Sequence, residues 1–249
     1  MTEKNRVKIL GVPVDMVDRG QAMQIFEESF PQPGVTMVVT PNSEIVQRAS
    51  KEGELRELIS SADLIIPDGV GLVYASKIIG CPLSERVTGI DFLESIIAYL
   101  EKNGKSIYFF GSKPGVAEAA AENIKKKYPK LIVAGTHDGY FKPEEEAGIV
   151  KEINDSSADF LCVALGAPKQ ERFIHDHRSE LNVNGAIGVG GSLDVWAGTL
   201  KRAPEFYRKH GLEWLYRLIQ EPSRYKRMLA LPVFMLRVIF TGKSKEEKK

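Results

Sequence analysis

Cysteine is scarce in this sequence: Cys81 and Cys162 are the only two among 249 residues. Two cysteines exclude a disulfide-stapled scaffold and cannot by themselves form a zinc site, so we interpret both as small buried apolar residues. Apolar runs of about 18 residues are absent as well, and the first ten residues, MTEKNRVKIL, contain no apolar signal-peptide core. We therefore expect an intracellular, cytoplasmic protein that does not span a membrane.

Several short catalytic motifs are also missing. No G-x-G-x-x-G follows a strand-like run, which disfavours a nicotinamide-dependent oxidoreductase, and neither G-x-S-x-G nor H-E-x-x-H occurs. There is no D-x-D, and hence no obvious carboxylate pair to hold a divalent cation on a diphosphate. His175 and His177 are two residues apart and cannot share a helix face, which argues against a metal pair there. We expect neither a metal nor another cofactor, and no nucleic-acid partner.

What is present is ordinary globular composition, with 43% hydrophobic and 27% charged residues. Short apolar runs alternate with amphipathic stretches. The runs that predict buried strands are 35–39, 63–67, 106–110, 131–135, 159–165 and 186–190, and the stretches that predict helices are 43–60, 70–80, 89–102, 114–127, 143–154 and 168–178. This alternation indicates an α/β fold, a Rossmann-like, mainly parallel sheet with helices on both faces, over residues 1–199.

Residues 200–249 differ in character from the rest. From residue 201 onward the chain has 13 Lys and Arg against 5 Asp and Glu, although the formal net charge of the whole protein is only +1. Long apolar side chains at helical spacing accompany these cations, and the apolar stretch around 228–240 is too short to span a bilayer. We predict a basic, helical, amphipathic C-terminal appendage. Part of it could simply pack on the core, but its composition favours peripheral binding to an anionic membrane surface.

Polar residues follow the first two strand-like runs, at the sheet edge where doubly wound folds bind ligands. Thr40 and Asn42 come after run 35–39, and either could instead cap the helix that begins there. Asp68 follows run 63–67 in a glycine-flanked turn, where a carboxylate can approach a ligand or cap the next helix. Arg86 lies shortly afterwards in the polar segment SERVTGIDF, and these neighbouring polar residues favour the ligand-binding interpretation of Asp68.

Glycine-containing loops follow three further runs. They hold Gly111 in FFGSKPG, Gly166 with Gln170 in LGAPKQE, and Gly190 with Asp194 in GVGGSLD. Backbone N–H groups in such a loop, at the start of a helix, suit a phosphate or diphosphate, although one loop alone is weak evidence. Three on one sheet edge indicate a ligand of nucleotide size. Asp194 could hold a ribose hydroxyl or cap a helix.

A set of motifs runs in a fixed order over nearly the whole chain: TPNSEIV, DGVG, RVTGIDF, FFGSKPG, HDGYF, LGAPKQE, GVGGSLDVWAGTLKRAP and GLEWLYRLIQEPSR. Together they resemble the WecG/TagA/CpsF family of bacterial glycosyltransferases. The resemblance implies an inverting transfer of N-acetylmannosamine from UDP-N-acetylmannosamine to undecaprenyl-diphosphate-linked N-acetylglucosamine, a step in wall teichoic acid synthesis. A different UDP-sugar donor stays open, as do the oxidoreductase and a non-catalytic membrane module that binds nucleotide-sugars.

The same resemblance implies roles for particular residues. Asp68 matches the general base. Residues of the acceptor and sugar pocket are matched by Thr40, Asn42, Arg86 and Gln170. Arginines that close over the donor diphosphate are matched by three residues of the appendage, Arg217, Arg224 and Arg227. A polyprenyl-linked acceptor would place the enzyme at the inner face of the cell membrane. Independently of the resemblance, an exposed apolar surface in the body or the appendage could support a homo-oligomer.

Overall fold

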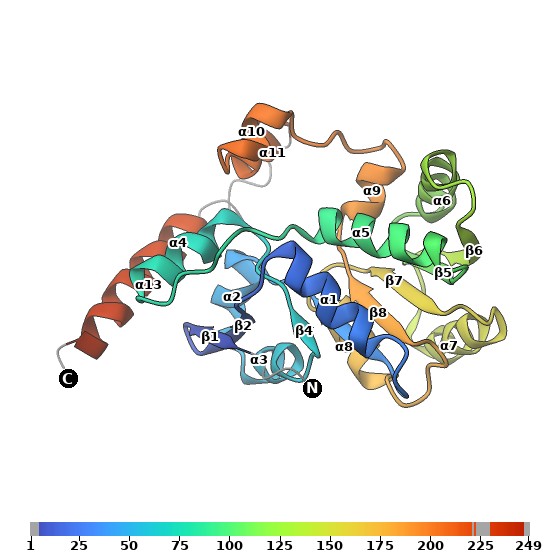
Figure 1. Cartoon of the computed structure of the whole chain (residues 1–249), viewed down its shortest axis with the longest axis horizontal. Coiled ribbons are helices and arrows are strands. Elements are labelled where there is room, and N and C mark those ends of the chain that lie inside the picture. The colour runs from blue at the N-terminus through green and yellow to red at the C-terminus, as the bar shows by residue number, and fades with distance from the viewer. Residues whose placement is uncertain (1–4, 221, 223–229, 247–249) are drawn as a thin grey trace.

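A six-stranded parallel sheet forms the centre of the protein (Figure 1), in a computed structural model that describes residues 5–220, 222 and 230–246. Its strands are β3 (Thr36–Val39), β4 (Leu64–Ile65), β5 (Ser106–Gly111), β6 (Ile132–His137), β7 (Phe160–Ala164) and β8 (Gly185–Gly188). Their spatial order is β4-β3-β8-β7-β5-β6, so β3 and β8, the first and last of these six strands along the chain, are neighbours in the sheet. Each strand overlaps one of the six predicted runs, and the predicted parallel sheet is confirmed.

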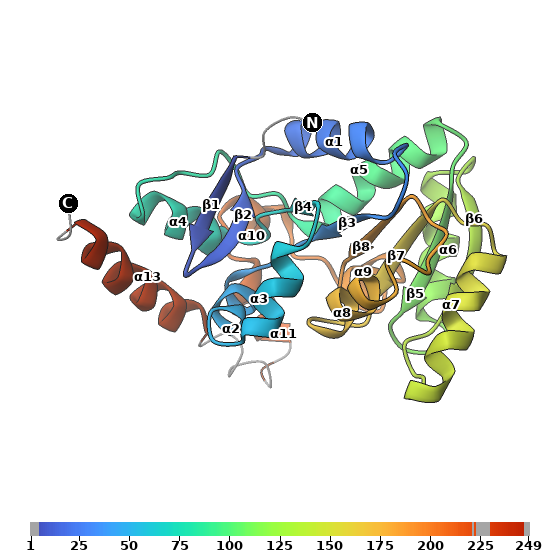
Figure 2. The same cartoon turned by 90° about the horizontal axis from the view of Figure 1, so that it is seen from below.

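Helices cover both faces of this sheet (Figure 2), as the alternating pattern predicts. One face carries α1 (Arg19–Ser29), α5 (Gly89–Lys102), α6 (Val116–Lys127) and α9 (Ser192–Trp196). The other carries α2 (Ser43–Ala49), α3 (Gly53–Ser60), α4 (Val70–Ile78), α7 (Glu146–Asp155) and α8 (Lys169–Asp176). Successive strand residues point to opposite faces, so Phe109 and Phe110 belong to different apolar clusters. The buried core therefore has two layers.

An antiparallel hairpin, which the sequence analysis did not predict, precedes the sheet. It consists of β1 (Arg6–Ile9) and β2 (Val12–Asp15), and each strand has only four residues, too few for a clear periodic pattern. Leu10 and Gly11 at its turn have φ of 50° and 84°, the left-handed geometry that suits two-residue hairpin turns. The buried Asp15 carboxylate accepts hydrogen bonds from Arg6 Nε at 2.7 Å and from the backbone N–H of Ile65 at 2.6 Å. The first bond joins β1 to β2, and the second attaches the hairpin to β4.

The structure also corrects two local expectations. Residues 43–60 form two helices, α2 and α3, because the chain leaves the first helix at Ser50, whose hydroxyl donates to the carbonyl oxygen of Gln47. Cys81 is exposed in the loop after α4, so its interpretation as a buried residue is wrong. Cys162 is buried in β7 as expected, and burial raises the pKa of its thiol.

The described part of the C-terminal appendage is helical, as predicted. It contains α10 (Glu205–Lys209), α11 (Glu213–Gln220) and α13 (Ala230–Glu246). α13 runs along α2 and α4 and buries Phe234 and Val238 in the same apolar cluster as those helices (Figures 1 and 2). Part of the appendage is therefore core packing. Within the part of the chain that the structure describes, no helix has the length and apolarity that a bilayer crossing requires.

Candidate active site

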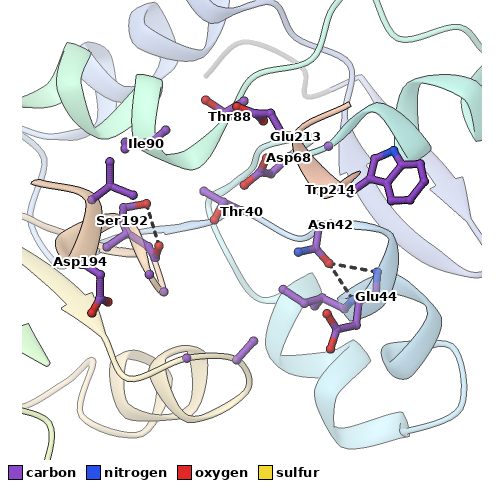
Figure 3. A pocket seen from close by; sticks show the side chains of 18 of the residues that line it. Thr40, Asn42, Glu44, Asp68, Thr88, Ile90, Ser192, Asp194, Glu213 and Trp214 are labelled. Atoms are coloured by element: carbon purple, nitrogen blue, oxygen red, sulfur yellow. Dashed lines mark hydrogen bonds between the residues drawn. The ribbon is translucent and has the colours of Figure 1, made fainter. Parts of the chain in front are cut away.

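A pocket of about 840 Å³ opens at the carboxyl ends of β3, β4, β7 and β8 (Figure 3). This edge of a doubly wound sheet is where ligands bind, because the loops that follow parallel strands meet there. The structure brings eight of the expected site residues together in its lining: Thr40, Asn42, Asp68, Arg86, Gly166, Gln170, Gly190 and Asp194.

Thr40 and Asn42 follow β3 and have different local roles. Thr40 is buried, and its hydroxyl donates a hydrogen bond to the carbonyl oxygen of Gly188 at 3.1 Å, which joins the ends of β3 and β8. Asn42 caps α2: its Oδ1 accepts from the backbone N–H groups of Glu44 and Ile45 at 3.0 and 3.1 Å. These donors fix the orientation of the amide. The Nδ2 group of Asn42 therefore points away from the helix, toward the middle of the pocket (Figure 3).

Asp68 follows β4 and lies in the middle of the pocket, near Thr40 (Figure 3). Its carboxylate is half-buried, and Oδ2 accepts a hydrogen bond from the backbone N–H of Gly89 at 3.3 Å. The N-cap of α4 is Gly69, so Asp68 does not cap that helix. Gly69 has a φ of 103°, which glycine adopts without strain, and the chain turns sharply directly after the carboxylate.

Gln170 joins the two glycine loops that follow β7 and β8. Its side chain is 3% exposed, and Oε1 accepts hydrogen bonds from the N–H groups of Gly166 at 3.2 Å and Gly190 at 2.9 Å. A Cβ on Gly188 would lie 2.6 Å from Gln170 Nε2, so glycine is needed beneath this side chain. The two loop N–H groups thus donate to Gln170 and order the pocket wall, although the sequence pattern predicts that they face a phosphate.

Gly111 does not line the pocket. Its φ is 123°, and a Cβ there would lie 2.5 Å from the carbonyl carbon of Ala164, so the close approach that requires glycine is to β7 and not to a ligand. The loop after β5 contributes Lys113 to the lining instead. Its neighbour Ser112 donates a hydrogen bond from Oγ to Asp194 Oδ2 at 3.3 Å. Asp194 therefore connects the loops that follow β5 and β8.

Arg86 contacts the C-terminal appendage. Its Nη1 donates to Glu213 Oε2 at 2.9 Å, in an ion pair whose side chains are 19% and 20% exposed. Glu213 and Trp214 of α11 both line the pocket, and neither was identified from the sequence, although both lie in the motif GLEWLYRL. Gly211 packs so closely on Val70 of α4 that a Cβ would lie 2.9 Å from it. One wall of the pocket therefore comes from the appendage.

Four further cations line the pocket and were missed, namely Arg48, Lys113, Lys201 and Arg202. Arg48 lies in α2 and forms an ion pair with Glu52. The other three lie in the motifs FFGSKPG and GVGGSLDVWAGTLKRAP, which were interpreted through their glycines and not through their charges. Arg202 forms an ion pair with Asp91 of α5. Burial disfavours ionisation of Asp91, but hydrogen bonds from Thr88 and Arg202 outweigh it and lower the pKa of the Asp91 carboxyl.

The charge of a bound diphosphate could be balanced by arginines of the appendage or by a metal ion, and the sequence favours the arginines. Arg224 and Arg227 lie outside the described residues, and so does the side chain of Arg217, whose backbone belongs to α11. Their closure over a diphosphate stays a prediction. Among the residues that the structure describes, no group of three or more His, Cys, Asp or Glu side chains is placed to hold a metal ion.

Comparison with known proteins gives a consistent result. The family model described as "Glycosyl transferase WecG/TagA/CpsF family" matches residues 7–248. Three similar proteins are each named N-acetylglucosaminyldiphosphoundecaprenol N-acetyl-beta-D-mannosaminyltransferase. The one from Bacillus spizizenii is 37% identical over 222 residues, 85% of this chain and 86% of the relative. The one from Bacillus subtilis is 37% identical over 210 residues (84% and 81%), and the one from Staphylococcus aureus strain MW2 is 34% identical over 235 residues (94% and 92%).

Proposed function

The chain belongs to the WecG/TagA/CpsF family of glycosyl transferases, and on this premise we propose that it transfers N-acetylmannosamine from UDP-N-acetylmannosamine to undecaprenyl-diphosphate-linked N-acetylglucosamine. The names of the relatives support both the transferred sugar and the lipid-linked acceptor, and the donor follows from the name. The product would be the linkage unit of wall teichoic acid. The observation that carries the proposal is the half-buried carboxylate of Asp68 in the middle of the pocket.

Asp68 is the proposed general base. Inverting transfer requires a group that takes the proton from the acceptor hydroxyl as this oxygen attacks the anomeric carbon from the face opposite UDP. The Gly89 N–H holds one carboxylate oxygen, Oδ2, in place, and the Asn42 amide points into the same space. A positioned base of this kind contributes about 10²–10⁴-fold to the rate.

The donor nucleotide is proposed to lie on the other side of the pocket, near the loops after β5, β7 and β8. Lys113 lies in the loop after β5, Asp194 lies in α9 just after the β8 loop, and Lys201 and Arg202 lie further along the chain. The cations would balance the charge that UDP gains as it departs, and Asp194 offers an acceptor for a ribose hydroxyl. Arg217, Arg224 and Arg227 are proposed to add to this charge when the donor is bound.

The decisive variant is Asp68→Asn, which keeps the shape of the side chain and removes the base. We expect kcat to fall about 10²–10⁴-fold, while UDP binding, measured by calorimetry, stays close to that of the unaltered protein. Asp176→Asn, at the exposed C-terminal end of α8, is the matched control and is expected to change neither quantity. Transfer by Asp68→Asn at the unaltered rate would remove Asp68 from the mechanism.

The identity of the donor is tested separately with a panel of UDP-sugars and a short-chain lipid-linked acceptor. The proposal requires UDP-N-acetylmannosamine to be the preferred donor. A preference for another UDP-sugar would keep the family and the mechanism but change the pathway. Binding of UDP-sugars without any transfer would favour a non-catalytic module.

Peripheral attachment to the inner face of the cytoplasmic membrane is part of the proposal, since the acceptor is a membrane lipid. Its structural support is α13, which buries Phe234 and Val238 against the protein and exposes Val233, Leu236 and Phe240. Residues three and four apart lie on one helix face, so the exposed apolar side chains form a stripe that could enter an interface. The excess of Lys and Arg after residue 200 would attract the same segment to anionic lipid.

A further inference from the structure

A buried carboxyl group lies directly behind the wall of the pocket. Glu171 follows Gln170 on α8, and its side chain is only 2% exposed. Its Oε1 accepts a hydrogen bond from Gln170 Nε2 at 2.9 Å, and its Oε2 has no hydrogen-bond partner among the described residues. Burial raises the pKa of the Glu171 carboxyl, and the hydrogen bond from Gln170 opposes this. Such a group is costly in a core, so packing alone gives no reason for a glutamate here.

The contacts of Gln170 show what this carboxyl can do. The two ends of the Gln170 amide face opposite partners: Oε1 accepts from Gly166 and Gly190, while Nε2 donates to Glu171. If the amide turned over, its NH₂ group would face two N–H donors and its oxygen would face the oxygen of Glu171. Glu171 therefore accepts the hydrogen bond that selects one orientation of the Gln170 amide. In that orientation the amide oxygen binds the loops after β7 and β8 and fixes their separation.

The ordered wall extends across the pocket to the proposed base. The side chain of Gln170 covers Gly188, whose carbonyl oxygen accepts from the Thr40 hydroxyl at 3.1 Å. Thr40 Oγ1 in turn lies 3.1 Å from the position that a Cβ of Gly89 would occupy. The N–H of Gly89 is the group that donates to Asp68. Thr40 thus lies between Gly188, to which it is hydrogen-bonded, and Gly89, which donates to the carboxylate of Asp68.

We propose that Glu171 is a positioning residue for the transfer reaction: by holding the Gln170 amide, it sets the distance between the loops after β7 and β8 and so the position of the pocket wall that faces the donor. Glu171 itself lies outside the pocket lining and acts only through Gln170. The inference rests on the proposed function for its effect on catalysis, whereas its effect on the two loops does not depend on the substrate.

The first test needs no substrate. Glu171→Leu removes the acceptor and leaves the Gln170 NH₂ group buried without a partner, whereas Glu171→Gln keeps an oxygen that can accept. Hydrogen exchange of the backbone N–H groups of Gly166 and Gly190, measured by NMR, should become about 10- to 100-fold faster in Glu171→Leu, because the Gln170 amide that these groups bind has lost its own buried hydrogen-bond partner. Glu171→Gln should stay near the unaltered protein.

The second test uses transfer kinetics. A positioning role predicts that Glu171→Leu raises KM for the donor about 10- to 100-fold at temperatures well below its melting temperature, where the variant is fully folded. A role in packing alone predicts that activity follows the melting temperature. In a Gln170→Ala background, Glu171→Leu should have no further effect on KM, because the residue through which it acts is gone.

The control is Glu152→Leu, which removes a carboxylate that accepts a hydrogen bond from Tyr108 on β5, away from the pocket lining. It should leave both loop N–H groups and the donor KM unchanged. Unaltered exchange in Glu171→Leu, or an undiminished effect of this substitution in the Gln170→Ala background, would overturn the proposal. Absence of transfer by the unaltered protein would instead refute the proposed function, and the exchange experiment would still decide the role of Glu171.

Discussion

A methyl group at residue 71 tests whether α13 docks where the structure places it. Gly71 lies in α4, and a Cβ there would be 2.1 Å from Ser43 Oγ of α2 and 2.7 Å from Leu231 Cδ1 of α13. In a helix with free space, Gly→Ala stabilises by about 0.5–1 kcal/mol. Here Ser43 and Leu231 must both move, and overpacking of this kind costs about 1–3 kcal/mol. We expect Gly71→Ala to have a net cost of roughly 0–2.5 kcal/mol.

Gly148→Ala is the matched control, because it lies in α7 and nothing is within 4 Å of its Cβ position. The difference between the two variants isolates the overpacking cost, and about 1–3 kcal/mol corresponds to about 2–12 °C in melting temperature for a chain of this length. Thermal unfolding followed by circular dichroism measures it. Leu231→Ala should reduce the harm done by Gly71→Ala. Equal melting temperatures for Gly71→Ala and Gly148→Ala would show that α13 is not packed against α4 at this point.

Three further predictions concern metal, membrane and pH. Transfer should survive EDTA, because we expect cationic side chains to balance the diphosphate; loss of activity that Mg²⁺ or Mn²⁺ restores would contradict this. Leu236→Asp on the exposed face of α13 should reduce sedimentation with anionic vesicles, whereas Ile132→Asp, at an exposed position on β6, should not. Burial lowers the pKa of His177, but hydrogen bonds with Glu146 and Glu180 outweigh it and raise the pKa. Protonated His177 therefore stabilises the folded protein. This contribution is full below about pH 6.5 and is lost as pH rises through the raised pKa. The melting temperature of His177→Gln should therefore approach that of the unaltered protein at alkaline pH, and a constant difference would refute this assignment.

The six strands of the parallel sheet were predictable because each overlaps a short apolar run, as expected for a sheet covered on both faces. Asp68, Thr40 and Asn42 could be chosen as candidates because they follow such runs directly. The order of the strands in the sheet cannot be predicted from local sequence pattern, however. The position of β8 between β3 and β7 determines which loops meet at the pocket. The pairing of Arg86 with Glu213, 127 residues apart, was invisible for the same reason.

Glu171 shows a different limit. In the sequence KQER it is one charge among others at the start of a helix, where an exposed acidic residue is common, and only the packing of α8 shows it to be buried. Gly111 illustrates the converse error, since a glycine after a strand suggests room for a ligand. In the structure that room is taken by the neighbouring strand.

The adjacency of β3 and β8 has a consequence for synthesis of the protein on the ribosome. The hydrogen bond between Thr40 and Gly188 joins residues 148 positions apart, so the pocket cannot assemble until most of the chain has been translated. During this interval β3 has only β4 beside it, and its other edge is an open template for unwanted pairing. Contacts of such large sequence separation also slow folding. We therefore expect nascent chains that stop before β8 to aggregate or recruit chaperones, and the arrival of residues 185–188 to be the event that commits the protein to its native sheet.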